Sequence, residues 1–227
     1  MIYAENILLC IAVPLGISIL FVKGPVRRFV FAFLLGMGVC LLSAYISGYL
    51  SIVTGYGETN TSIFLSPIIE ELMKLFPLLF FLLMFDEDNT SIVHTSIAIG
   101  AGFATFENCC YILNYGAGNL SYVIIRGMSV GVMHIMSVFA LTLWFLISMR
   151  LKAFSFPTVV GALSLSMTFH AIYNLLVSKP GITSVIGYLM PIVTAILLSL
   201  AYRKLEMRYE LRFGENKTSA PNKETDA

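Results

Sequence analysis

Charged residues are scarce in this sequence. Only 12% of the 227 residues are Asp, Glu, Lys or Arg, whereas about a quarter of the residues in a soluble globular domain are charged. Hydrophobic residues make up 58%, and the mean hydropathy is +0.86. These proportions exclude a soluble enzyme and indicate an integral membrane protein, in which the lipid bilayer covers much of the apolar surface.

Cysteine patterns that hold disulfides or metals are also missing. The four cysteines lie in apolar stretches without a CxxC spacing, so we interpret them as small buried hydrophobic residues. They are Cys10, Cys40, Cys109 and Cys110. A nucleic-acid partner is not expected either, because the basic residues flank the apolar segments, where membrane orientation explains them.

The strict alternation of barrel strands is absent, so the apolar segments are expected to be helices. A membrane-spanning helix needs about 20 residues. The segments that reach this length are Asn6–Val22, Phe29–Val53, Ile63–Phe85, Ile92–Tyr115, Ser121–Met149, Phe156–Val177 and Ile182–Tyr202. The predicted fold is all-α, a polytopic membrane protein with seven or eight transmembrane helices and a polar intramembrane site. Residues 1–204 form the membrane domain, and residues 205–227 form a polar tail that we expect to be disordered.

The basic residues predict how the chain lies in the cell membrane. With seven spans, eleven Lys and Arg residues fall on one side, and Lys179 falls on the other. Cytoplasmic segments carry the excess of Lys and Arg. We therefore expect a multi-pass protein of the cell membrane with its N-terminus outside and its C-terminus in the cytoplasm. The acidic turn Asp86–Asp88 then lies inside, which the rule tolerates because acidic residues contribute little.

Three charges interrupt the segment Ile63–Phe85: Glu70, Glu71 and Lys74. A charge at membrane depth costs from ~2.5 to well over 10 kcal/mol, depending on the method, which marks such residues as functional candidates. Glu70 and Lys74 are four residues apart in the favourable order, so we predict an ion pair between them. Glu71 points about 100° away on the helix, which leaves its carboxylate free to meet other polar groups.

Other ionisable residues reach a similar depth in the outer half of the predicted membrane. Counting about 1.5 Å per residue from the outer ends of their helices brings Glu107, His134 and His170 near Glu70. A carboxylate can accept a proton from water, while an imidazole or amide stabilises the developing oxyanion. The same groups could hold a zinc ion and its water. Individual residues could instead have a purely structural role. Glu70 and Lys74 could form a structural ion pair, and His134 could form a hydrogen bond to a neighbouring helix.

Several other polar residues receive less specific interpretations. His94 lies at the opposite end of its span and is expected at the inner surface. Arg126 could extend to the outer headgroups or position a substrate. We interpret the serines of the last spans as helix-packing residues; they are Ser129, Ser137, Ser164 and Ser166.

Four motifs in order resemble the PrsW family of intramembrane proteases. EELMK (Glu70–Lys74) is similar to its EExxK motif, and FATFEN (Phe103–Asn108) to its FxxxEN motif. His134 and the pair His170 and Asn174 fit two later motifs, the last being HxxxN. The family belongs to a superfamily with the CAAX prenyl proteases and the bacteriocin-immunity type of membrane protease. Those relatives carry EExxxR and FxxxH motifs, from which this chain departs at Lys74 and Glu107.

The resemblance implies an intramembrane endopeptidase that cuts a single-pass membrane protein near the outer face. In the best-known members this substrate is an anti-sigma factor. The residues implied in catalysis are Glu70, Glu71, Lys74, Glu107, Asn108, His134, His170 and Asn174. Zn²⁺, if the family uses it, would be held by Glu71, Glu107, His134 and His170; otherwise the glutamates and histidines would activate a water directly.

Two other functions remain open at this stage. A proton- or ion-coupled transporter would also use buried Glu, Lys and His, although the sequence lacks an inverted repeat and its polar set lies at one depth. An inactive scaffold that binds membrane segments would keep the fold without the chemistry. Other protease classes are excluded, because the spans contain neither an HExxH motif nor a pair of aspartates nor a Gly-x-Ser-Gly motif.

Overall fold

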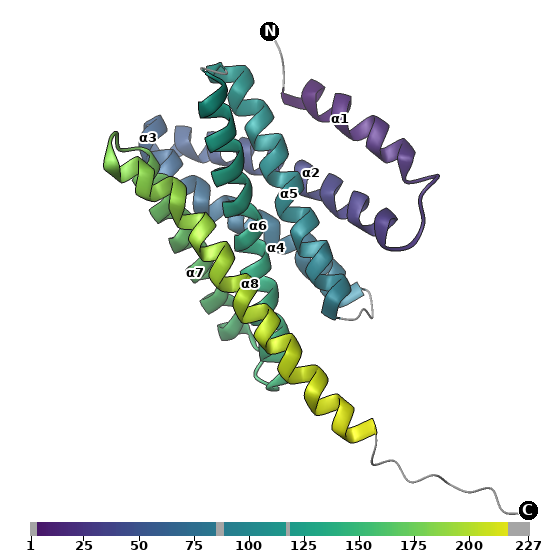
Figure 1. Ribbon diagram of the computed structural model, residues 1–227. Coiled ribbons are helices and arrows are strands. Elements are labelled where there is room, and N and C mark those ends of the chain that lie inside the picture. Colours follow the sequence, from purple (N-terminus) through teal and green to yellow (C-terminus); the bar gives the residue numbers. More distant parts are fainter. Residues whose placement is uncertain (1–3, 85–88, 117–118, 218–227) are drawn as a thin grey trace, which may run out of the picture.

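The structure is a computed structural model that describes residues 4–84, 89–116 and 119–217. These residues form helices and turns without a strand, which confirms the all-α prediction (Figure 1). The elements are α1 (Ala4–Ser18), α2 (Gly24–Thr54), α3 (Glu58–Asn60), the π-helix η1 (Thr61–Leu65), α4 (Ser66–Met84), α5 (Asn89–Tyr115), α6 (Leu120–Arg150), α7 (Phe156–Val177) and α8 (Ile182–Lys217). The predicted acidic turn Asp86–Asp88 lies outside the described residues.

Within the described ranges, five helices are long and apolar enough to cross a membrane. They are α2, α5, α6, α7 and α8, the last as far as Lys204. The chain is thus a multi-pass membrane protein, but the predicted count of seven or eight spans is not confirmed. α1 has only 15 residues, and α4 has 19 residues but carries Glu70, Glu71 and Lys74.

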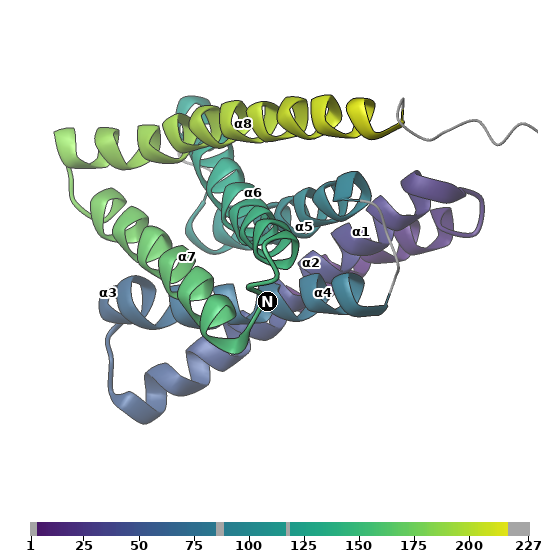
Figure 2. The ribbon, with the colours of Figure 1, turned by 90° about the horizontal axis from the view of Figure 1, so that it is seen from below.

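Four of the five long helices contact the charged helix α4. α5 packs between α2 and α6, and α6 contacts α7 and α8 in turn (Figures 1 and 2). α4 contacts α2, α5, α6 and α7. Its polar side chains are therefore enclosed by protein, which is where ionisable groups at membrane depth are found.

Glycines let α5 approach both of its neighbours at backbone distance. A Cβ atom on Gly102 would lie 2.0 Å from the carbonyl oxygen of Phe33, and one on Gly36 would lie 2.2 Å from that of Ile99. On the α6 side, a Cβ on Gly100 would lie 2.6 Å from the Cα of Ile135. These close contacts bring the α5 residue Glu107 near α6.

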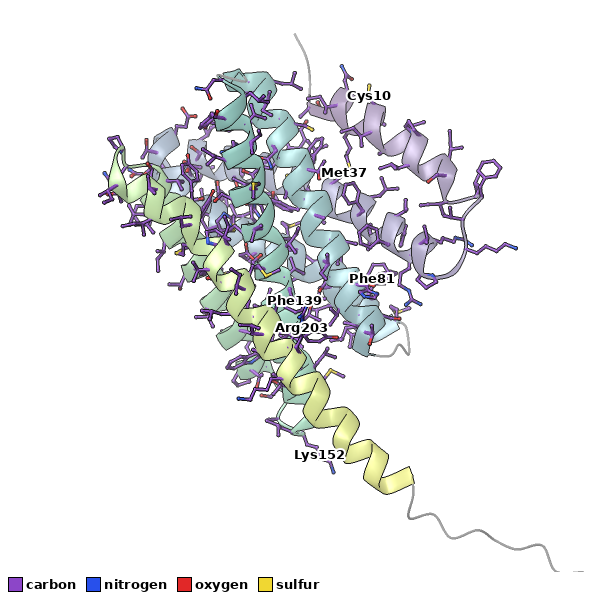
Figure 3. All side chains as sticks on the ribbon, viewed as in Figure 1. Cys10, Met37, Phe81, Phe139, Lys152 and Arg203 are labelled. Atoms are coloured by element: carbon purple, nitrogen blue, oxygen red, sulfur yellow. The ribbon has the colours of Figure 1, made fainter. Side chains whose placement is uncertain are left out.

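An apolar cluster fills the space between α2 and α5. Met37 and Cys40 of α2 pack against Phe103 and Phe106 of α5, and Met37 is labelled in Figure 3. Cys40 is buried as predicted, whereas Cys10 on α1 is exposed. Cys109 and Cys110 are half-buried, and all four thiols are free.

The C-terminal tail differs from its prediction. α8 continues as a helix through Lys217, so the polar residues 205–217 are helical rather than disordered. Residues 205–212 are mostly strong helix formers, and the chain has no proline between Pro191 and Pro221. The polar composition of this segment therefore does not end the helix. The rest of the predicted tail, residues 218–227, lies outside the described residues.

Candidate active site

Lys74 pairs with Glu71, so the predicted ion pair between Glu70 and Lys74 is wrong. Lys74 Nζ lies 2.5 Å from Glu71 Oε1, and both side chains are fully buried. Spacings of three and four residues both bring side chains to one helix face. Glu71 is the more deeply buried carboxylate, since Glu70 keeps 16% of its side chain exposed, and a buried charge has the greater need of a partner.

Both oxygens of Glu71 are occupied by hydrogen-bond donors. Besides Lys74, His170 Nδ1 lies 2.9 Å from Oε1, and the Ser166 hydroxyl lies 2.8 Å from Oε2. An ionised carboxylate only accepts hydrogen bonds, so His170 Nδ1 and Ser166 donate. Glu71 is therefore not the free carboxylate that the sequence predicted; it joins α4 to α7.

Lys74 also orients His134. Its Nζ lies 2.9 Å from His134 Nδ1 and 3.3 Å from the Ser137 hydroxyl, and 4.7 Å from the centre of the Phe103 ring. An ammonium group has no lone pair, so His134 Nδ1 accepts and the proton of the neutral ring is on Nε2. His134 Nε2 then donates to Glu107 Oε2.

Glu107 connects the buried histidine to the rim of the site. While Oε2 accepts from His134, Glu107 Oε1 lies 3.2 Å from Arg126 Nη2. The Arg126 guanidinium stacks on the ring of Tyr111, with its Cζ 3.4 Å from the ring centre. The sequence suggested a contact with lipid headgroups or with a substrate for Arg126. In the structure Arg126 bonds to Glu107 instead.

Glu70 and His170 leave two acceptor atoms facing each other. Glu70 Oε2 is buried and has no hydrogen-bond partner among the described residues, and it lies 3.7 Å from His170 Nε2. Because His170 Nδ1 donates to Glu71, Nε2 of the neutral ring carries only a lone pair. Two facing acceptors are stabilised by a proton donor or a cation between them.

A metal ion fits this arrangement. Glu70, His134 and His170 each offer a ligand atom, and these atoms lie within 4.8 Å of one another. Carboxylate and imidazole are ordinary zinc ligands. Both oxygens of Glu71 and of Glu107, which the sequence predicted as ligands, are engaged by other partners, so Glu70 is the carboxylate that is available.

The remaining predicted residues lie around this cluster. Asn174 Nδ2 donates to the backbone oxygen of Ser62 in η1, at 2.8 Å. Asn108 Oδ1 is buried without a hydrogen-bond partner in the described part of the chain. His94 is exposed near the start of α5 and belongs to no part of the cluster.

Two serines that we interpreted as packing residues contact the charged groups. Ser166 bonds Glu71, and Ser137 receives a contact from Lys74. Spacing offered a signal for both, because Ser166 precedes His170 by one helical turn and Ser137 follows His134 by three residues. Serine is common at helix contacts in membranes, so the signal was weak.

Comparison with known proteins agrees with this site. The model of a family described as PrsW family intramembrane metalloprotease matches residues 24–200, which include every residue of the cluster. No curated protein and no solved structure matches the chain.

Proposed function

Because this chain belongs to the PrsW family of intramembrane metalloproteases, we propose that it hydrolyses a peptide bond of a single-pass membrane protein near the outer face of the membrane. The observation that carries the proposal is the buried, unpartnered Oε2 of Glu70 facing His170 Nε2. Membership of a protease family favours this function over the transporter and the scaffold.

Glu70 is the proposed general base. A base must be within hydrogen-bond reach of the proton it accepts, and Glu70 Oε2 is the carboxylate oxygen of the cluster that no neighbour occupies. Glu71 is the less suitable base in the present arrangement, because Lys74, His170 and Ser166 already bond to both of its oxygens. Glu71 and Lys74 instead hold His170 and His134 in their orientations.

In a mechanism with a metal, for which we propose Zn²⁺, Glu70, His134 and His170 would hold the ion, and Glu70 would be a ligand. Glu70 is the proposed base in a mechanism that uses water alone. A bound divalent cation supplies Lewis-acid activation of a water and of the substrate carbonyl. Both nitrogens of His134 are hydrogen-bonded, to Lys74 and Glu107, so His134 would exchange one of these bonds on binding. Glu107 and Arg126 position His134 from the rim.

The proposed substrate is an anti-sigma-factor-like protein with one transmembrane helix, as the family resemblance implies.

The proposed orientation places the N-terminus outside. The basic residues support it, because eleven Lys and Arg residues fall on the predicted cytoplasmic side and Lys179 falls on the other. Accessibility of single cysteines at positions 119 and 152 to a membrane-impermeant reagent would test the orientation, with labelling from outside expected only at position 119.

Co-expression with a tagged single-pass substrate tests the function. Wild-type protein is expected to release the tagged outer domain, while Glu70→Gln and His170→Ala are expected to stop the cleavage. His94→Gln is the matched control, because it removes an exposed imidazole far along α5 from the cluster. Undiminished cleavage by Glu70→Gln would contradict the assigned base. Elemental analysis of purified wild-type and His170→Ala protein separates the zinc mechanism from one that uses water alone.

A further inference from the structure

Ser166 is a buried hydroxyl inside the site that the four family-like motifs do not include. It is 7% exposed on α7, and its Oγ lies 2.8 Å from Glu71 Oε2. Ser166 precedes His170 by one helical turn, so a single helix brings both residues to Glu71. The two donors occupy different oxygens of the same carboxylate.

The hydroxyl completes the coordination of a fully buried charge. Lys74 and His170 both contact Glu71 Oε1, and Ser166 is the donor to Oε2. A carboxylate oxygen that loses its donor in a buried site loses the stabilisation that offset its removal from water. Without Ser166, rotation of Glu71 toward another donor would break the geometry at Oε1.

The orientation of His170 depends on that geometry. Glu71 Oε1 accepts from His170 Nδ1, which keeps the proton on Nδ1 and turns Nε2 toward Glu70, 3.7 Å away. Groups that bond the far nitrogen of a ligating histidine fix its tautomer and ring direction, and their loss weakens metal binding. Ser166 acts on His170 through Glu71.

We propose that Ser166 is a positioning residue that locks the Glu71 carboxylate and thereby sets the tautomer of His170. The inference rests on the proposed function, in which His170 Nε2 faces the metal or the water.

The histidine content of the chain makes the proposal directly measurable. The sequence has three histidines, so ¹⁵N-histidine labelling gives few signals, which single His94→Gln and His134→Gln variants assign. The nitrogen shifts distinguish a proton on Nδ1 from one on Nε2. Wild-type protein is expected to show His170 with the proton on Nδ1, and Ser166→Ala is expected to show a mixture of tautomers.

Matched variants separate positioning from packing. Ser166→Cys keeps the side-chain size with a weaker donor and is expected to show the same mixture of His170 tautomers as Ser166→Ala. It replaces the alanine variant if the alanine protein does not fold. Ser166→Thr keeps the hydroxyl and is expected to restore the wild-type tautomer. Ser164→Ala, on the exposed face of the same helix, is the control that should change nothing.

Metal affinity provides the second measurement. By chelator competition, Ser166→Ala is expected to bind Zn²⁺ about 10- to 100-fold more weakly than wild type, with recovery in Ser166→Thr. A wild-type His170 tautomer in both Ser166→Ala and Ser166→Cys overturns the proposal. A threonine protein that resembles the alanine protein overturns it too, by assigning the effect to packing. If wild type binds no zinc, the metal mechanism fails while the tautomer result still decides the role of Ser166.

Discussion

Glu71 and Lys74 form an ion pair three residues apart inside α4, with Nζ 2.5 Å from Oε1 and both side chains fully buried. This pair separates the roles of two adjacent glutamates. Glu71 is neutralised and bonded from α4 and α7, while Glu70 retains an unpartnered oxygen beside His170. The two carboxylates are chemically identical, but their different surroundings decide which of them can accept a proton.

Substitution of each glutamate should therefore have a different effect. Glu70→Gln is expected to lower cleavage by about 10²- to 10⁴-fold, the usual contribution of a general base, with little change in thermal stability. Glu71→Gln is expected to lower the stability itself, because it leaves the buried Lys74 without its anion. Substrate cleavage and thermal unfolding of the purified proteins measure the two effects. Equal loss of stability in both variants would contradict the different roles assigned to Glu70 and Glu71.

The buried pair should show strong coupling between its members. Lys74→Met leaves the Glu71 charge uncompensated and is expected to cost about 3–5 kcal/mol, as removal of one partner of a buried pair does. In Lys74→Met with Glu71→Gln, neither residue of the pair is charged, and the amide oxygen can still accept a hydrogen bond. The double variant is expected to be more stable than either single variant. Additive losses in a double-mutant cycle would show that the two groups do not interact.

Hydropathy predicted an all-helical multi-pass membrane protein, and motif spacing selected charged groups that lie close together in the structure. Both kinds of prediction depend on residue type and period alone. The pairing inside α4 was not predictable, since Lys74 can reach Glu70 or Glu71 within the same helix. The choice depends on His170 and Ser166, which lie about 100 residues away in the sequence and meet Glu71 only after α7 packs on α4.

Helix lengths were predictable to a lesser degree. The first apolar segment was expected to span the membrane, but α1 ends at Ser18 and has 15 residues. At the C-terminus, a change from apolar to polar residues was interpreted as the end of order, while the backbone remains helical to Lys217. Hydropathy reports the solvent that a segment prefers, and helix propensity reports whether its backbone stays regular.

Close packing of α2 on α5 should depend on individual glycines. Gly102→Ala would place a Cβ 2.0 Å from the Phe33 carbonyl oxygen, so the helices must separate. We expect a loss of at least about 1–3 kcal/mol in stability, the usual cost of overpacking. Gly38→Ala is the matched control on α2, because its Cβ would meet nothing within 4 Å. The control is expected to be neutral or stabilising by up to ~1 kcal/mol through helix propensity. Similar unfolding temperatures for the two variants would contradict the close contact.

Asn174 connects α7 to the π-helix that leads into the charged helix. Its amide donates to the backbone oxygen of Ser62, 2.8 Å away, so Asn174→Ala should free η1 from α7. We expect faster hydrogen exchange in residues 61–65 and a stability loss of about 1 kcal/mol. Asn174→Asp, which keeps the size but cannot donate when ionised, should give the same result.

The same variants test whether Asn174, which the family resemblance implies in catalysis, donates a hydrogen bond to the oxyanion. In the structure its amide is engaged with Ser62, so catalytic use of Asn174 requires that bond to break. Removal of one oxyanion donor costs about 10²- to 10³-fold in turnover. A loss of this size with unchanged exchange in residues 61–65 would support the catalytic role and contradict the tether. Faster exchange with nearly normal turnover would show that Asn174 holds the entrance of α4 in place.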